Sequence, residues 1–328
     1  MKFLRIFSLG IIIFGALLSC KKETEKQWDT QIEKPVDKVE IVDISKEFYN
    51  PNLPLEAFQK QFPWFQGTVT NEDFVKRRQD SAEAKIYHEA IAKIDIKKLD
   101  VDLKKLYARI HQYFPDFKTP RTYLYSSALQ AVTDPIFYKP EENFIFVDVT
   151  AFMGENNPRY KGLEQYYQTS MNPQNIVPKI SQILAESKVP FNRDHQKFLD
   201  QLVYQGKIMT LQDAFLPETP DYLKINYTQK QYEWAVANEV NIWNYLVEQN
   251  LLYSDDSRLV DRFIVPGPFS KFYTEIDNES TPQIGIFTGW QICKKYFQAN
   301  PDTPLQKFLD TSAQEIFTQA KYKPKFTE

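Results

Sequence analysis

Histidine is scarce in this chain, although zinc hydrolysis and nucleophilic catalysis by serine or cysteine commonly depend on it. The three histidines are His88, His111 and His195. His88 and Glu89 form half of an HExxH zinc motif, but the second ligand position, four residues after His88, is Ala92. We therefore interpret His88 and Glu89 as polar residues on a solvated helix face. The alternative is a zinc site assembled in space from all three histidines, whose spacing is not typical of metal ligands.

Cys20 lies in the sequence context of an acylated cysteine. Lys2 and Arg5 precede an apolar run from residue 6 to residue 18, whose length suits an export signal better than a membrane span. The small residue Ser19 comes directly before Cys20, and this arrangement resembles a bacterial lipobox. We therefore expect cleavage before Cys20 and a covalent lipid, palmitate included, that attaches the chain to a membrane. The alternative is an ordinary export signal followed by a chance cysteine.

The second cysteine, Cys293, has no partner once Cys20 is acylated, so no intramolecular disulfide is expected. Trp290, Cys293, Tyr296 and Phe297 fall on one helical face, which favours a core residue over a nucleophile. The chain has no G-x-S-x-G, P-loop or G-x-G-x-x-G motif. The acidic residues at 255–256 and 275–279 lack calcium-loop spacing, and we expect them to lie in a solvated loop.

The composition excludes nucleic acid as a partner. Residues 1–19 contain two basic residues and no acidic residue, so their removal leaves a net charge of −5. The chain also lacks a basic patch interleaved with aromatic residues. Abundant Phe and Tyr with few Gly favour a packed, largely helical body.

Hydrophobic periodicity predicts a mainly helical α+β protein with a small sheet. We expect strands at 41–44, 122–124 and 143–149, and helices at 71–94, 103–114, 176–186, 194–215, 228–251, 286–298 and 303–320. A loop is expected at 254–281. The predicted organisation is a signal peptide at 1–19, a lipidated cysteine and flexible tether at 20–55, and a single globular domain at 56–328.

A series of short segments carries a family resemblance. In order behind the lipobox, the chain has Phe144–Asp148, Ala151–Gly154, Tyr204–Ile208, Asn238–Trp243, Thr281–Gly285 and Gly289–Ile292. This series resembles the gliding motility-associated lipoprotein family GldB, from about Phe62 to about Thr318. The resemblance implies an envelope lipoprotein required for gliding over surfaces, in bacteria where gliding is linked to type IX secretion.

The same resemblance implies a gluzincin-like zinc-peptidase scaffold, in which one helix carries HExxH and a later helix supplies a third ligand, Glu. Here the first helix is expected at 176–182, which has no His and no acid, and Gln205-Gly206 replaces the later Glu-Gly pair. A neutral amide is a poor zinc ligand, so we expect a degenerate scaffold that is no enzyme and holds no metal or other cofactor. The predicted cleft of this scaffold is lined by Lys179, Ser181, Gln182, Gln205, Glu239 and Trp243.

The leading hypothesis is a non-catalytic scaffold or docking component of the gliding machinery, with the membrane and envelope proteins as its partners. One alternative is an envelope metallopeptidase-like hydrolase. Another is a solute- or peptide-binding lipoprotein with exposed aromatic residues such as Trp64, Tyr166 and Tyr167, for which core packing is the simpler explanation. The chain is expected to face the periplasm. Lys21 lacks the acidic character that retains such lipoproteins in the inner membrane, which favours the outer membrane.

Overall fold

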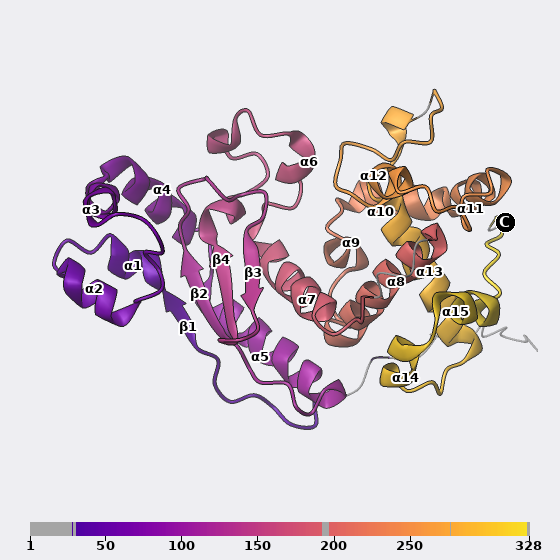
Figure 1. Ribbon diagram of the computed structural model, residues 1–328, viewed down its shortest axis with the longest axis horizontal. Coiled ribbons are helices and arrows are strands. Elements are labelled where there is room, and N and C mark those ends of the chain that lie inside the picture. The colour runs from indigo at the N-terminus through magenta and orange to yellow at the C-terminus, as the bar shows by residue number, and fades with distance from the viewer. Residues whose placement is uncertain (1–27, 29–30, 192–196, 276, 327–328) are drawn as a thin grey trace, which may run out of the picture.

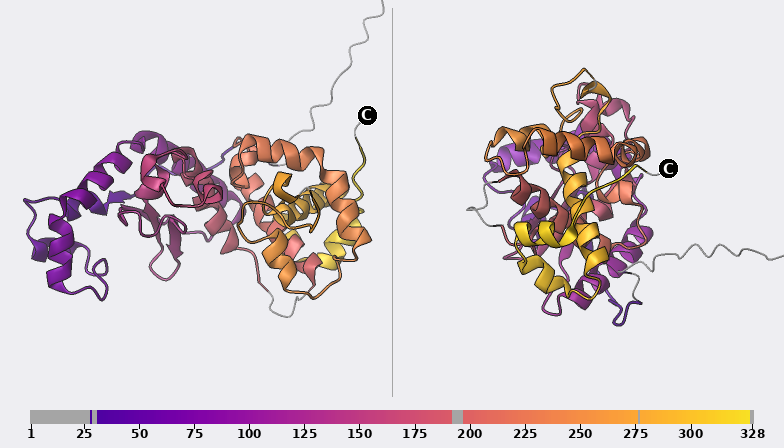
Figure 2. Two further views of the ribbon diagram at one scale, coloured as in Figure 1. Left: turned by 90° about the horizontal axis from the view of Figure 1, so that it is seen from above. Right: turned by 90° about the vertical axis from the view of Figure 1, so that its right-hand side faces the viewer.

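The computed structural model describes residue 28 and residues 31–191, 197–275 and 277–326 (Figure 1). The predicted signal peptide, Cys20 and His195 lie outside the described residues. Helices make up 53% of the structure and strands 6%, which confirms the mainly helical α+β class with a small sheet. The molecule is elongated, with the first helices at one end, the sheet next to them and the C-terminal helices at the other end (Figure 2).

The sheet has the order β1-β2-β4-β3, and its strands are β1 (Ile41–Asp43), β2 (Arg121–Tyr125), β3 (Ile136–Lys139) and β4 (Phe144–Asp148). β1 and β4 both run parallel to β2, whereas β3 is an antiparallel edge strand paired with β4. Successive side chains of a strand point to opposite faces. Ile145 and Val147 therefore face one core cluster, while Tyr123 and Phe146 face a second, aromatic one.

Helices cover both faces of the sheet. The N-terminal helices are α1 (Ile44–Phe48), α2 (Leu55–Gln61), α3 (Asn71–Gln79), α4 (Ser81–Ile91) and α5 (Ile96–Tyr113). Phe48, Phe58 and Phe74 from α1, α2 and α3 pack on the aromatic face. The opposite face packs against α5 and α7 (Ile176–Glu186), and the buried stripe of α5 comprises Leu99, Leu103, Leu106, Tyr107 and Ile110.

The C-terminal half is a bundle of helices around α8 (Phe198–Phe215) and α13 (Ile284–Ala299). The other helices that follow the sheet are α6 (Gln165–Gln168), α9 (Asp221–Lys224), α10 (Gln229–Ala237), α11 (Glu239–Glu248), α12 (Arg258–Phe263), α14 (Leu305–Asp310) and α15 (Ala313–Ala320). α8 and α13 cross at two glycines. A Cβ on Gly289 would lie 1.8 Å from the Leu202 carbonyl oxygen, and one on Gly206 would lie 2.3 Å from the Gly289 oxygen.

The predicted helices at 71–94, 228–251 and 303–320 are each two helices in the structure, so those single-helix predictions are wrong. The helical conformation is interrupted at Asp80, at Asn238 and near Thr311. The Asp80 carboxylate accepts the backbone N–H groups of Ala82 and Glu83, which starts a new helix. Short polar side chains compete with the backbone in this way, and hydrophobic periodicity does not register them. The expected loop at 254–281 also contains α12.

The folded part begins earlier than the predicted tether allows. Residues 41–48 form β1 and α1, and Ile44 and Phe48 are buried. The predicted strand at 41–44 is confirmed as β1, and it joins the sheet because its pairing with β2 satisfies backbone groups that an isolated strand would leave to water.

The glycine contact between α8 and α13 is directly testable. We expect Gly289→Ala to lower the free energy of unfolding by about 2 kcal/mol or more, because the clash outweighs the ~1 kcal/mol gain in helix propensity. Urea unfolding of the chain without its first 20 residues measures this effect. The control is Gly267→Ala, where the nearest atom to the added Cβ is 3.8 Å away and the change should stay within about 0.5 kcal/mol. Equal stability of the two variants would contradict the prediction.

Candidate functional site

One face of α7 gathers polar side chains beside the sheet. Lys179, Gln182 and Glu186 lie three and four residues apart, and this spacing places them on a single helical face. The Gln182 Nε2 donates to Glu186 Oε1 at 3.0 Å, and its Oε1 accepts from Asn226 Nδ2 at 2.9 Å. Asn226 follows α9, so this contact joins α7 to the helical half. We call Lys179, Gln182, Glu186, Asn226 and the nearby Asp134 the α7 polar face.

Lys179 is half-buried, and burial lowers the pKa of its ammonium to about 8 although the carboxylate of Asp134 acts in the opposite direction. Its ammonium has no hydrogen bond or ion pair with a described residue. Burial likewise raises the pKa of Glu186, and Asp134 adds to this increase. The Asp134 charge, from the loop between β2 and β3, therefore acts on both α7 residues.

A buried aspartate holds that loop. Asp148, at the end of β4, accepts from the backbone N–H and the hydroxyl of Ser127 at 3.1 and 2.5 Å. It also accepts from the backbone N–H and hydroxyl of Thr150 at 3.0 and 2.7 Å. Between these anchors, Ala128 and Leu129 have φ values of 54° and 73°, which are unfavourable for residues with a side chain. Strain of this kind persists only where surrounding contacts fix the backbone, so Asp148 is a positioning residue for the Asp134 loop.

The structure separates the residues predicted to line the cleft. Ser181 lies on the buried side of α7, and its hydroxyl has no hydrogen-bond partner among the described residues. Gln205 is half-buried on α8. Glu239 and Trp243 lie on α11 and pack against the C-terminal segment, where Tyr322 donates to Glu239 Oε1 at 2.7 Å and its ring meets Trp243 edge-on at 4.8 Å.

Lys179 and Gln182 are thus the two predicted residues that share the polar face. Sequence reasoning missed Glu186, Asn226 and Asp134. Helix spacing from Gln182 could have indicated Glu186. No sequence signal indicates Asn226 or Asp134, because both are brought to α7 from distant loops.

A second polar cluster, inside the helical half, is fully paired. The Lys224 ammonium donates to Asp213 at 2.7 Å and to Asp221 at 3.1 Å, and Lys294 donates to Asp221 at 2.8 Å. The Trp290 indole N–H donates to the other Asp213 oxygen at 2.7 Å. Burial raises the pKa of Asp221, but its two lysine partners outweigh that effect and bring it to about 2. These contacts connect α8, α9 and α13.

A cavity of about 540 Å³ lies at the N-terminal end of α7. Ile94, Val177 and Phe215 contribute apolar walls, and Lys93 and Glu218 lie among its charged lining residues. Lys179 does not line this cavity, so the cavity and the α7 polar face are different places on the molecule.

The other residues considered for chemistry have structural surroundings. Cys293 is a fully buried free cysteine, which confirms the predicted core position. His88 is exposed, as expected for a solvated helix face. His111 Nε2 lies 3.2 Å from the Thr119 hydroxyl, and burial lowers its pKa. Trp64 packs on the aromatic face of the sheet. Within the described residues, no three His, Cys, Asp or Glu side chains are arranged to hold a metal ion.

The acidic loop is organised by hydrogen bonds. Asp277 accepts from the backbone N–H groups of Phe272, Tyr273 and Thr274, and Asp256 pairs with Arg258 at 2.8 Å. These carboxylates are therefore already used by the loop itself.

Lys179 destabilises the fold in its charged form. Because its pKa is about 8 in the folded state and ordinarily 10.5, the unfolded chain binds more protons between these values, so stability rises with pH in this window. We expect Lys179→Met to stabilise the protein by about 2 kcal/mol at pH 7, and the gain should shrink from pH 8 to pH 10.5. Urea unfolding across this range measures it. Lys295→Met, at an exposed position on α13, is the control and should change little. A pH-independent effect of Lys179→Met would contradict the prediction.

Comparison with known proteins supports one family. The family model described as gliding motility protein GldB matches residues 25–324, which is nearly the whole chain. No curated protein and no solved structure matches the chain. The matched range includes α7, α8 and α13 and the short segments that carry the resemblance in the sequence. The chain therefore belongs to the GldB family of gliding motility proteins.

Proposed function

We propose that this chain is a lipid-anchored, non-catalytic docking component of the bacterial gliding machinery, which in such bacteria is linked to type IX secretion. Its membership of a family of gliding motility proteins supports a role in gliding. The lipobox-like segment that ends at Cys20 supports the anchor. No described helix has the length and apolar character needed to cross a membrane. Lys21 favours an anchor in the outer membrane, and in this proposal the protein faces the periplasm.

The observation that carries the non-catalytic proposal is the chemistry of the α7 polar face. α7 lies beside the antiparallel edge strand β3 and packs on α8, which supports a scaffold derived from a gluzincin. At this place a zinc peptidase needs imidazole ligands, but the described α7 polar face presents the amine of Lys179, the amide of Gln182 and the carboxylate of Glu186, with no histidine among them.

Such groups bind by hydrogen bonds and charge. Lys179 can pair with an acidic group of a partner, and Gln182 and Asn226 offer amide donors and acceptors. In the described part of the chain β3 pairs with β4 alone, so its outer edge offers further backbone groups beside α7. We therefore propose an extended polypeptide segment of an envelope protein as the occupant, held without hydrolysis.

The anchor is tested by removing the acylated thiol. Cys20→Ala should move the protein from the membrane fraction to the periplasmic soluble fraction and abolish gliding, because a single unacylated chain has no other membrane attachment in this proposal. Cys293→Ala is the matched control, because that cysteine is buried in the core. Gliding that persists with a released Cys20→Ala protein would refute the anchoring role.

The docking face is tested by a charge reversal that leaves the core intact. Glu186→Arg adds a cation at the exposed end of the α7 polar face, and we expect gliding to fall sharply while the thermal unfolding midpoint and membrane attachment stay unchanged. Glu248→Arg makes the same change on the exposed face of α11 and should leave gliding normal. Equal gliding of the two strains would argue against docking at α7.

A further inference from the structure

The described N-terminal segment is attached to the body at Trp28. Its ring meets Phe297 of α13 edge-on with ring centroids 5.1 Å apart, and it meets Tyr113, the last residue of α5, at 6.0 Å. Phe297 in turn packs on Phe308 of α14 at 4.7 Å. Edge-to-face aromatic pairs contribute about 0.5–1.5 kcal/mol each beyond the area they bury. Trp28 is therefore held where the sheet half and the helical half meet.

Further contacts hold the chain between Trp28 and β1. The Gln31 carbonyl accepts from Gln112 Nε2 at 3.0 Å. Val36 packs against the main core, and Val39 is 7% exposed. The predicted tether at 20–55 therefore contributes to the body from Trp28 onward.

The length of the connecting chain then limits the distance between Cys20 and the folded part of the protein. Seven residues separate Cys20 from Trp28, and a fully extended chain gains at most about 3.6 Å per residue, so the two Cα atoms lie within about 29 Å. If Trp28 were released, the first deeply buried side chain would be Val39, and the same calculation gives a reach of roughly 68 Å. Trp28 thus halves the allowed distance between the membrane and the fold.

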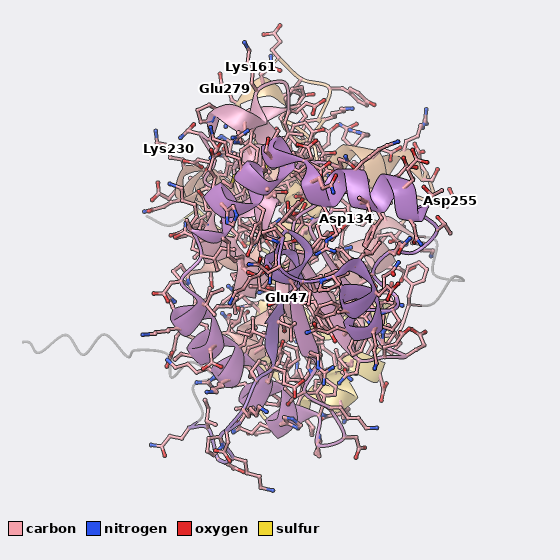
Figure 3. The ribbon with its side chains drawn as sticks, turned by 90° about the vertical axis from the view of Figure 1, so that its left-hand side faces the viewer. Glu47, Asp134, Lys161, Lys230, Asp255 and Glu279 are labelled. Atoms are coloured by element: carbon pink, nitrogen blue, oxygen red, sulfur yellow. The ribbon has the colours of Figure 1, made fainter. Side chains whose placement is uncertain are left out.

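We propose that Trp28 is a clamp that holds one face of the protein against the lipid surface. This face comprises the C-terminal end of α5 and α14, which lie together at the lower edge of the molecule in Figure 1. The inference rests on the proposed acylation of Cys20. The opposite edge carries Lys161 and Glu279, both of which lie at the upper end of the view in Figure 3. That edge faces away from the membrane and is free for envelope partners.

Single cysteine probes can measure this orientation, because Cys20 is acylated and Cys293 is buried. Two variants of the acylated full-length protein, Lys307→Cys on α14 and Lys161→Cys, each carry a donor dye on the new cysteine, and both positions are exposed. Each labelled protein is reconstituted in vesicles whose lipid headgroups carry the acceptor dye. We expect stronger energy transfer from position 307 than from position 161. Trp28→Ala should lower transfer from position 307 toward the value at position 161, whereas Trp28→Phe should keep the difference.

A pair of insertions tests the clamp without changing Trp28 itself. Twelve Gly/Ser residues placed after Glu23 lengthen the chain between the anchor and Trp28, and transfer from position 307 should fall. The same insertion placed after Asp29 lies beyond the clamp and should leave transfer unchanged. Equal effects of the two insertions, or equal transfer from the two probes in the unmodified chain, would overturn the proposal.

The anchor and the clamp fail in different ways. If Cys20 is not acylated, Cys20→Ala and the unmodified protein will bind vesicles equally, and the proposed function fails together with this inference. If only Cys20→Ala loses vesicle binding while Trp28→Ala and both insertions leave transfer unchanged, acylation stands and the clamp is wrong.

Discussion

The close crossing of α8 and α13 is the contact on which the helical half depends. Two glycines make it possible, because at Gly289 even a methyl group would lie 1.8 Å from a carbonyl oxygen of the other helix. The approach brings Trp290 within hydrogen-bond distance of Asp213, which also receives Lys224 from α9. A wider crossing would leave the indole N–H and the Asp213 oxygen that accepts from it buried without this hydrogen bond, at a cost of about 1–3 kcal/mol for each unsatisfied group. The glycines and the buried ion pairs are therefore one structural unit.

The sheet half has a comparable dependence on one buried carboxylate. Asp148 ends β4 and accepts four hydrogen bonds from Ser127 and Thr150, so it ties the loop after β2 to the segment after β4. This connection holds two successive residues at positive φ and presents Asp134 to α7. The α7 polar face is thus assembled from both halves, since Asn226 reaches Gln182 from the helical side.

Trp28 is where the N-terminal segment contacts both halves of the fold. Trp28 contacts α5 of the sheet half and α13 of the helical half, so an aromatic residue eight positions after Cys20 bridges the two parts of the fold. In the proposed arrangement a short tether holds the edge formed by α5 and α14 toward lipid and leaves the opposite edge to partners. Docking and anchoring then use different surfaces, as a component that links a membrane to other envelope proteins requires.

The sequence by itself determined the mainly helical class, the strands β1, β2 and β4, α7 and the family, because periodicity and ordered motifs are local properties of the chain, whereas the short edge strand β3 was missed. It also predicted Cys293 as a core residue from the apolar face that it shares with Trp290. It could not find the breaks at Asp80 and Asn238, where a polar side chain or a local backbone conformation interrupts a continuous hydrophobic pattern. Tertiary structure alone placed Glu239 with Tyr322 and Asn226 with Gln182, because pairs separated by 44 or 83 residues meet only after the helices pack.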